Sequence, residues 1–533
     1  MTAGSRTRTF SVLLLLTLVG GVLAAVRANA SDCPVSPGPV IDVTTCPVPA
    51  VPDDNEDDTD AINHAIEQIH ALDGGRVYFP PGTYDAANVK HRSGVELNGP
   101  STAILRRLPG PASLIVGHVT DHTGRTTAGS RTLTNVSNPE DFEQGAVVGI
   151  RGGAGGSNAQ RTTLSAPVPA EGSPFVLANG AGFPPSTDFL KIDNEIIWYR
   201  SQNGTKNAVL QNVGRGRFAT GVSPHNSGAA VRLLQRLYAR VVSVSGTTVT
   251  IDRPVPQKLS STEISVGGVN MAVTGLTLDG RPTHSTVNTF PLKYELARNV
   301  RISTATIING EHGGVRFAHG TSESVVENSV LLNNGDPANG LGAVIWLFQG
   351  AGQNIVRNNQ IGSETDASNN GIMADDRTDT ASEWDGPSDG NRIEGNIIKI
   401  PRAGDNAAVA IQGSANNVVS GNEIYYMFDG VRVHKSRQGS HPLTSRLNTV
   451  SNNRLTGNVN YALTVTGVQN TIRDNAVVDS GNNCRDYTGT PPQNSWSGNT
   501  TDDGSLCPAS SQLAPSSSSG GSAPLIGLGD LSL

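Results

Sequence analysis

Three polar side chains follow short apolar strands at the same place in successive repeats. They are Asp375 after Ile372-Met373-Ala374, Gln412 after Val409-Ala410-Ile411, and His434 after Val431-Arg432-Val433. Side chains alternate between the two faces of a strand, and neighbouring strands lie about 4.8 Å apart. If these strands stack in parallel, Asp375, Gln412 and His434 form one outward column. A carboxylate, an amide and an imidazole gathered in this way could hydrogen-bond a ligand and transfer protons.

Basic side chains border this column. The same alternation points Arg316 outward in a parallel column with Arg432, and it places Asp376 and Lys435 at strand ends. Cations beside a carboxylate and an imidazole are unusual for a merely solvated strand face. We therefore expect catalysis to involve Asp375, Asp376, His434, Arg432 and Lys435, with Arg316 and Gln412 binding substrate.

The preceding repeat offers a further cation and carboxylate, Lys293 and Glu295. They point outward if Phe290, Leu292 and Tyr294 point inward, and Lys293 then joins the substrate-binding groups. A slip of one residue in this repeat would turn both charged side chains inward.

An acidic segment follows the Asp375-Asp376 pair directly, and it surrounds Trp384 with Asp379, Glu383 and Asp385. Calcium takes six to eight oxygen ligands, so these carboxylates could hold a calcium ion. Alternatively, Trp384 could stack against a sugar, or the segment could be an exposed polar loop without a function.

Two reactions suit the outward columns. In β-elimination from a uronate, cations neutralise the carboxylate and a base removes the adjacent proton. Here Arg316, Arg432 and Lys435 would neutralise, and His434 or Lys435 would be the base. In hydrolysis, Asp375 and Asp376 would supply the acid and the carboxylate that activates water. Cations outnumber well-paired carboxylates on this face, which favours β-elimination.

Two other functions remain open. A C5-epimerase would share the first step of elimination and return the proton on the opposite side, with Tyr294 as a candidate donor. A non-catalytic adhesive protein of the cell surface would need no charged groups converging on one strand column. Nothing in the columns names the polymer, although the cations indicate an acidic one.

The elements that position these residues repeat along the second half of the chain. The pattern Asn-x-apolar-x-x-Asn-x-apolar occurs five times, beginning at Asn354, Asn391, Asn417, Asn448 and Asn470. Successive alternating strands are as little as 22 residues apart, as between Val409 and Val431. This length fits one coil of a parallel β-helix, an all-β fold in which equivalent asparagines stack as a hydrogen-bonded ladder. The Leu-x-x-Leu-x-Leu spacing of a leucine-rich solenoid is absent.

The first part of the chain carries a second signal. Asp58 to Leu72 predicts an amphipathic helix, which would cover the open end of the stack, and Arg76-Val77-Tyr78-Phe79 predicts a strand. The residues Asp57-Asp58-Thr59, then Gly74-Gly75-Arg76-Val77-Tyr78-Phe79-Pro80-Pro81-Gly82-Thr83-Tyr84, resemble the N-terminal signature of the pectate-lyase-like superfamily. That resemblance implies a single-stranded right-handed parallel β-helix. It also implies a function among lyases, glycosidases, epimerases and tailspike depolymerases, which act on polysaccharides.

Composition limits the alternatives. Of 533 residues only 16% are charged, 61 are glycine, and the net charge is −7. Such a chain lacks the charged helix formers of a coiled coil and the basic patch that nucleic acid requires. Residues 1–30 have the charged start, apolar stretch and Ala28-Asn29-Ala30 site of a secretory signal, so we expect a secreted protein with no membrane segment after cleavage.

The remaining chain divides into segments. Four cysteines predict two short-loop disulfides, Cys33 with Cys46 and Cys484 with Cys507. We assign 31–114 to the cap and first coils, 115–255 to a β-rich insertion of antiparallel hairpins, 256–507 to further coils, and 508–533 to a disordered tail. The insertion could form one wall of a substrate groove or merely decorate an early coil. Both monomers and trimers are compatible with the sequence.

Overall fold

A computed structural model gives the structure of the chain. It describes residues 32–507 except for 128, 152–160, 170–173, 182, 184–185, 193–194, 212, 214, 216–223, 234–235, 256–261, 282–288, 336–341, 363–369, 376–387, 401–405, 435–444, 481, 489–493, 503 and 505–506. The predicted signal and tail, residues 1–30 and 508–533, lie outside the described part. No helix within it is long and apolar enough to cross a membrane.

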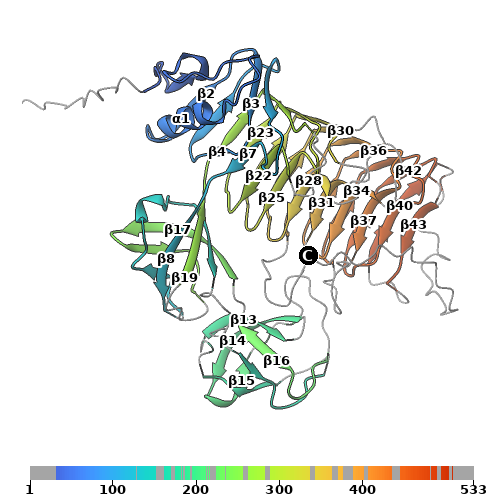
Figure 1. Cartoon of the computed structure of the whole chain (residues 1–533). Coiled ribbons are helices and arrows are strands. Elements are labelled where there is room, and N and C mark those ends of the chain that lie inside the picture. Colours follow the sequence, from blue (N-terminus) through green and yellow to red (C-terminus); the bar gives the residue numbers. More distant parts are fainter. Residues whose placement is uncertain are drawn as a thin grey trace, which may run out of the picture.

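Three parallel sheets built from the described residues wind around one axis, and the chain is a right-handed parallel β-helix (Figure 1). The twelve-stranded sheet contains β1 (Val40–Asp42), β2 (Gly75–Tyr78), β5 (Val95–Asn98), β20 (Ala272–Thr274), β23 (Arg301–Ser303), β26 (Val325–Glu327), β29 (Ile355–Arg357), β32 (Arg392–Glu394), β35 (Val418–Ser420), β38 (Thr449–Ser451), β41 (Thr471–Arg473) and β44 (Ser495–Ser497).

The other two sheets complete each coil. The eleven-stranded sheet contains β3 (Gly82–Ala86), β6 (Ala103–Arg107), β21 (Thr277–Asp279), β24 (Thr306–Ile308), β27 (Val330–Leu332), β30 (Gln360–Gly362), β33 (Ile397–Lys399), β36 (Glu423–Tyr425), β39 (Arg454–Thr456), β42 (Ala476–Val478) and β45 (Thr500–Thr501). The ten-stranded sheet contains β4 (Val89–His91), β7 (Ile115–Gly117), β22 (Leu292–Glu295), β25 (Val315–Ala318), β28 (Ala343–Phe348), β31 (Asn370–Asp375), β34 (Ala407–Gln412), β37 (Asp429–His434), β40 (Tyr461–Val465) and β43 (Asn482–Asp486).

Apolar side chains at equivalent positions form the core inside the coils. In the twelve-stranded sheet the central residue of each short strand points inward, and paired residues are buried one above another. This column contains Val77, Leu97, Val273, Ile302, Val326, Val356, Ile393, Val419, Val450 and Ile472. Burial of this continuous apolar surface favours one register over its alternatives, because a slip of one residue would expose it.

The asparagines of the repeat form two continuous ladders, as the sequence predicts. In each ladder, the side-chain oxygen of one asparagine accepts hydrogen bonds from the backbone and side-chain nitrogens of the preceding asparagine. The Asn417 oxygen, for example, lies 2.9 Å from the backbone nitrogen and 3.1 Å from the side-chain nitrogen of Asn391. The first ladder runs through Asn354, Asn391, Asn417, Asn448, Asn470 and Asn494, and the second through Asn359, Asn396, Asn422, Asn453, Asn475 and Asn499.

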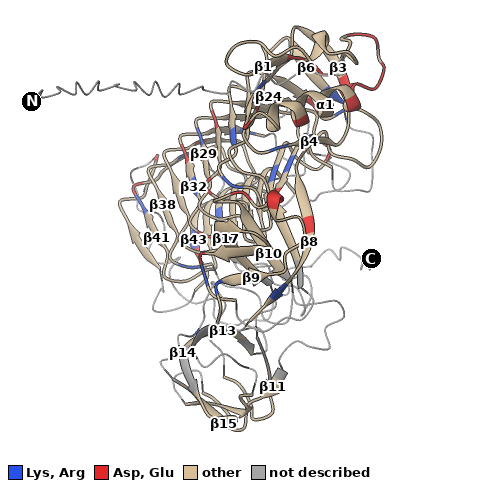
Figure 2. Cartoon of the chain, turned by 90° about the vertical axis from the view of Figure 1, so that its left-hand side faces the viewer, with Lys and Arg blue, Asp and Glu red and all other residues tan. Residues whose placement is uncertain are grey.

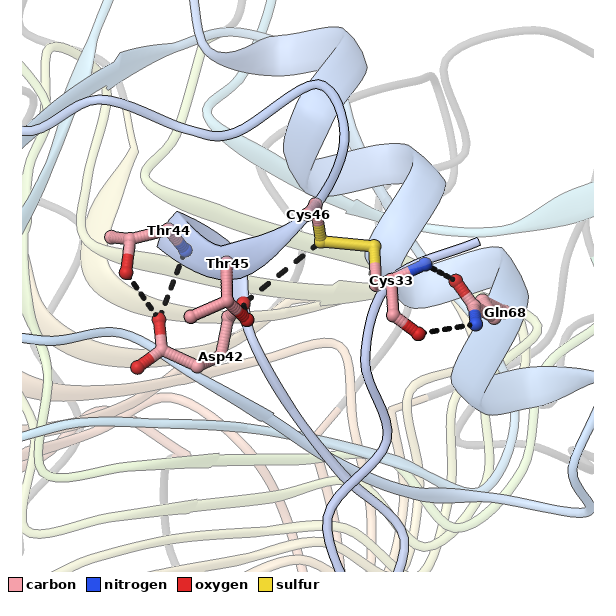
Figure 3. Close-up of a disulfide and its surroundings, with 6 residues drawn as sticks. All are labelled: Cys33, Asp42, Thr44, Thr45, Cys46 and Gln68. Atoms are coloured by element: carbon pink, nitrogen blue, oxygen red, sulfur yellow. Dashed lines mark hydrogen bonds between the residues drawn. A yellow bond between two sulfur atoms is a disulfide. The ribbon is translucent and has the colours of Figure 1, made fainter. Parts of the chain in front are cut away.

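A cap covers the N-terminal end of the stack. Helix α1 (Thr59–His70) buries Ile62, Ile66 and Ile69 against the first coils. Disulfide Cys33–Cys46 fastens the segment before the helix, which also contains the short helix η1 (Val43–Thr45). Figure 3 shows this segment tied to α1, because the Gln68 amide exchanges two hydrogen bonds with the Cys33 backbone. The second predicted disulfide, Cys484–Cys507, is also present.

Two antiparallel units interrupt the coils after β7. The first is a closed barrel formed by β8 (Val119–Thr126), β9 (Thr132–Thr134), β10 (Val147–Arg151), β17 (Arg236–Ser245), β18 (Thr248–Ile251) and β19 (Thr262–Gly267). The short helix η2 (Pro139–Asp141) lies between β9 and β10. The second unit is a six-stranded sheet, formed by the part of the chain between β10 and β17. It contains β11 (Arg161–Thr163), β12 (Phe175–Asn179), β13 (Ser186–Ile192), β14 (Glu195–Asn203), β15 (Lys206–Gln211) and β16 (Ala230–Leu233).

The antiparallel strands of this insertion run from Val119 to Gly267, later at both ends than the predicted 115–255. Strand β7 belongs to the β-helix, because it pairs in parallel with β4 and β22. In two perpendicular views the barrel lies beside the β-helix and the six-stranded sheet lies beyond the barrel (Figures 1 and 2). The barrel is therefore the part of the insertion that is placed to border a surface of the coils.

Candidate functional site

The ten-stranded sheet brings the sequence-predicted polar residues onto one face. Asp375 pairs in register with Gln412, and Gln412 pairs with His434. A second register column starts at Lys293 and Arg316 and reaches Arg432 four strands later, through Trp346, Met373 and Ala410. The inward positions Leu292 and Tyr294 are fully buried, so the register of the earliest repeat has not slipped.

Most of this outward face is nevertheless buried. Asp375 is 0% exposed, Gln412 4%, Arg316 6% and Arg432 7%, whereas His434 is partly exposed. A second apolar cluster lies on this side of the sheet, outside the coils, and it consists of Phe290, Ala318, Ala343, Trp346, Phe348, Met373, Ala407 and Ala410. The predicted catalytic column thus borders a packed apolar layer rather than open solvent.

Arg316 is held by aromatic rings of this layer. Its guanidinium carbon lies 4.6 Å from the ring centre of Phe348, 5.5 Å from that of Trp346 and 5.9 Å from that of Phe290. Such cation–π contacts stabilise a desolvated guanidinium. Strand β28, which carries two of these rings, is apolar at every position, and loss of alternation indicates burial on both faces. That signal could have revealed the cluster from sequence.

Arg432 makes a buried ion pair. Its Nε donates to a carboxylate oxygen of Asp429 at 2.7 Å, and a second guanidinium nitrogen contacts the same oxygen. The other oxygen of Asp429 accepts from the Asn460 side chain at 3.0 Å and from the backbone N–H of Tyr461 at 3.1 Å. These contacts hold the Arg432 side chain in place, and the Asp429 carboxylate neutralises much of the guanidinium charge.

The partly exposed charges cluster at Glu295. The ammonium group of Lys293 lies 3.1 Å from a carboxylate oxygen of Glu295, and the His319 imidazole lies 3.8 Å from the same oxygen. Burial raises the pKa of the Glu295 carboxyl group, but Lys293, His319 and Arg316 outweigh it and hold the pKa below its usual value. Glu295 is therefore an ionised carboxylate between two potential proton donors.

A cleft of about 520 Å³ opens at this cluster, between the barrel and the β-helix. Glu295 and His319 line it from the coils, and the barrel contributes polar side chains from three strands. These are Asp121, His122 and Thr123 of β8, Tyr238 of β17, and Ser265 of β19, whose hydroxyl donates to Asp121 at 2.6 Å. The cleft therefore offers the carboxylates of Asp121 and Glu295 and the imidazole of His319. The His122 ring packs on Phe142 with its side chain only 1% exposed, and the Tyr238 hydroxyl oxygen is buried.

The walls of the cleft are fixed by local geometry. His319 has a positive φ of 50°, which non-glycine residues adopt at a cost, and its ring packs edge-on against Phe348. The next residue, Gly320, lies against the Tyr238 ring, since a Cβ there would approach that ring to 2.9 Å. Sequence alternation could not find His319, because it lies in the turn after β25.

Ion pairs hold the barrel against the coils. Glu323, in the turn before β26, contacts Arg298 at 2.6 Å and also pairs with Arg240 of barrel strand β17. These cations outweigh the effect of burial and keep the pKa of Glu323 low. The two walls of the cleft are thereby linked through one carboxylate.

Several predicted site residues lie outside the described part of the chain. They are Asp376 and Lys435 of the catalytic set, Trp384, and the candidate calcium ligands Asp379, Glu383 and Asp385. Among the described residues no group of three His, Cys, Asp or Glu side chains could hold a metal ion.

Tyr294 is buried inside the coils and does not reach the outer face. His91 Nε2 lies 2.9 Å from the Val95 carbonyl oxygen and must donate to it, so His91 Nδ1 accepts from the Tyr294 hydroxyl at 2.8 Å. The suggestion that Tyr294 returns a proton to a substrate is therefore wrong, because its hydroxyl is committed within the core.

Fold and site together define a right-handed parallel β-helix with an inserted barrel and a polar cleft between them. Residues 47–117 match the family described as rhamnogalacturonase A/epimerase, pectate lyase-like. This match covers the cap and first coils, so it supports a pectate-lyase-like fold there, and it includes none of the residues that line the cleft. No curated protein sequence matches the chain.

Solved structures of similar shape have different functions. The A-module of a mannuronan C-5 epimerase from Azotobacter vinelandii is 11% identical, with 85% of this chain and 93% of that one covered and a TM-score of 0.42. A surface adhesin of Streptococcus pneumoniae is 13% identical, with 87% and 97% covered and a TM-score of 0.43. A tailspike of an Escherichia coli bacteriophage, bound to a pentasaccharide, is 10% identical, with 89% and 61% covered and a TM-score of 0.45. Such low similarity carries no information about function.

Proposed function

We propose that this chain is an exported enzyme that cleaves an acidic polysaccharide by β-elimination in the cleft between barrel and β-helix. The observation that carries the proposal is the cluster of Lys293, Glu295 and His319, which is partly exposed where the predicted charged columns meet the cleft. The pectate-lyase-like match of residues 47–117 and two disulfides, typical of exported proteins, support it.

The chemistry follows from Glu295 and His319, which line the cleft, and from Lys293, which pairs with Glu295 beside it. Lys293 would pair with the uronate carboxylate, and neutral His319 would remove the proton next to it, while ionised Glu295 stabilises the imidazolium that forms. The C–H electron pair becomes the new carbon–carbon double bond, and the C4–oxygen bond breaks. The leaving oxygen would take its proton from water in the cleft.

The predicted set Asp375, His434 and Arg432 remains a proposal for the continuation of the same face. A catalytic group must touch the substrate, and Asp375 is fully buried while Arg432 is tied to Asp429. Partly exposed His434 is better placed, and we propose that it contacts sugar units beyond the cleft.

Hydrolysis is the second candidate, because Asp121 and Glu295 face the same cleft from its two walls. A glycosidase needs two carboxyl groups flanking the scissile bond, one as acid and one as base or nucleophile. Asp375 and Asp376 are the alternative pair.

Turnover of pectate, alginate and glucuronan, with a neutral glucan for comparison, tests the reaction. Elimination produces an unsaturated uronate that absorbs in the ultraviolet, whereas hydrolysis produces reducing ends without it. We expect His319→Ala to lower the rate of unsaturated product formation by about 100-fold or more, and the matched control His64→Ala on α1 to leave it unchanged. Reducing ends without unsaturation would replace elimination with hydrolysis, and binding without either product would favour an adhesive role.

A further inference from the structure

The last coils carry an aromatic and cationic cluster that the cleft does not include. The Arg485 guanidinium lies 4.3 Å from the ring centre of Tyr487 and 5.7 Å from that of Tyr461. Arg485 also donates to the Tyr461 hydroxyl at 2.6 Å. Tyr487 remains 47% exposed, so a charged group and an aromatic ring are presented to solvent in one fixed arrangement. We call Tyr461, Arg485 and Tyr487 the terminal platform.

The platform belongs to the same face as the cleft. Arg485 pairs in register with Thr464, and Thr464 pairs with Arg432, which continues the column that begins at Lys293. Figure 1 shows the strands β22 to β43 following one another along this sheet. Seven strand spacings of about 4.8 Å separate Lys293 from Arg485, which places the platform about 34 Å from the cleft.

Among the described residues, the Arg485 guanidinium contacts the two tyrosines and forms no ion pair, so its charge can pair with a ligand. The nearby carboxylate of Asp429 is paired with Arg432, so it does not neutralise the platform. The hydrogen bond to Tyr461 favours the charged guanidinium and raises the pKa of Arg485. Burial and the neighbouring Tyr461 raise the pKa of Tyr487 to about 12, so its ring stays neutral.

We propose that the terminal platform binds a uronate unit of the same acidic polysaccharide, far from the bond that is cleaved. The exposed Tyr487 ring would stack against the apolar face of the sugar, and Arg485 would pair with its carboxylate. This inference rests on the proposed function and adds a length requirement: an oligosaccharide too short to span about 34 Å cannot occupy cleft and platform together.

Calorimetric titration of the full chain with polygalacturonate, and with oligogalacturonates too short for this span, tests the platform. We expect Tyr487→Ala and Arg485→Gln each to weaken binding of the polymer by roughly tenfold and to leave binding of the short oligomers unchanged. Tyr487→Phe, which keeps the ring, and Tyr426→Ala, which removes an exposed tyrosine after β36 on another sheet, should bind like the wild type.

The platform is overturned if both Tyr487→Ala and Arg485→Gln, folded by circular dichroism, bind polymer with unchanged affinity. If the chain binds a neutral glucan as tightly as polygalacturonate, the proposal that the platform recognises an acidic sugar is wrong. If the chain cleaves the polymer but the platform variants bind it as tightly as the wild type, the inference is refuted and the proposed function is not. Platform-dependent binding without any turnover would refute the proposed function and leave the platform standing, and absence of all polymer binding would refute both.

Discussion

Three cations of one register column occupy different surroundings, and burial decides what each can do. Arg316 is enclosed by aromatic rings, Arg432 is paired with Asp429, and Lys293 is partly exposed beside the cleft. A buried guanidinium contributes to stability because its partner would otherwise be an uncompensated charge. An exposed ammonium group contributes little to stability and remains able to bind a substrate.

Substitution of these cations should separate the two roles. We expect Arg432→Met to lower the free energy of unfolding by about 3–5 kcal/mol, because it leaves the Asp429 carboxylate buried without its partner. Lys293→Met, the matched change in the same column, should change stability little and weaken substrate binding. Urea denaturation followed by circular dichroism measures the first effect, and equal stability of the two variants would contradict the assignment.

His91 makes the stability of the coils depend on pH. Its ring is completely buried, and burial lowers the pKa of His91 to about 4 from 6.5. Between these values the unfolded chain binds a proton that the folded chain does not. Stability from neutral His91 is therefore fully present above about pH 6.5 and is lost as pH falls toward 4, by about 3 kcal/mol.

The His91 contribution can be isolated by comparing wild type and His91→Gln. Burial also lowers the pKa of His118 to about 4, while burial raises the pKa of Asp58 to about 6 and that of Asp389 to about 7, so other groups titrate in this range. Their effects cancel in the difference between the two proteins. We expect the wild-type advantage in unfolding free energy to shrink between pH 7 and 4.5, and a constant difference would contradict this account.

At the scale of the elements, each coil is held to the next by more than strand pairing. An interior asparagine of either ladder is fully buried and satisfies two nitrogens of the preceding coil, as Asn422 does for Asn396 at 2.9 Å each. Buried donors without a partner cost more than the hydrogen bond itself contributes. The ladders therefore penalise any coil that shifts relative to its neighbour.

Asn422→Ala should destabilise the coils measurably. It leaves the buried backbone N–H of Asn396 without an acceptor, at about 1–3 kcal/mol, and removes one of two acceptors of the Asn396 side-chain nitrogen, which keeps the Val356 carbonyl oxygen. Asn499→Ala, at the end of the same ladder, should cost less near the open end of the stack, where the chain can relax. Asn226→Ala, an exposed position of the six-stranded unit, serves as the control. Thermal unfolding gives the order, and an Asn499→Ala cost above that of Asn422→Ala would contradict it.

At the scale of the whole molecule, the cleft exists because a barrel is docked on the β-helix. Glu323 joins the two units through Arg240 and Arg298, and Tyr238 of the barrel packs on Gly320 of the coils. The insertion thus forms one wall of the cleft. That this cleft is a substrate groove, one of the two roles that the sequence left open, stays our proposal. Neither wall alone supplies both Tyr238 and His319.

Glu323→Gln should loosen this docking. The carboxylate is about one-third exposed, so loss of its ion pairs should change global stability little. We expect KM for the polymer to rise several-fold with a smaller change in kcat, because the walls become less well ordered. Glu423→Gln, which removes an exposed carboxylate of β36, is the control. Steady-state kinetics measures both constants, and identical KM values in the three proteins would refute a role for the clamp.

Much of the fold was determined by the sequence itself. Alternating strands, paired asparagines and closely spaced cysteines predict stacked coils, ladders and two disulfides, all of which are present. The same alternation places Asp375, Gln412 and His434 in one register column. Such features are predictable because each coil repeats the same local pattern and contacts only its neighbours.

The accessible site was decided by tertiary structure alone. Alternation assigns a side chain to a face, but it cannot tell whether another layer covers that face, as it does at Asp375 and Arg316. The cleft joins Tyr238 to Glu295 and His319 through a docking contact that has no repeat in the sequence. Contacts of this kind depend on the shapes of two separately folded surfaces, and no local periodicity encodes them.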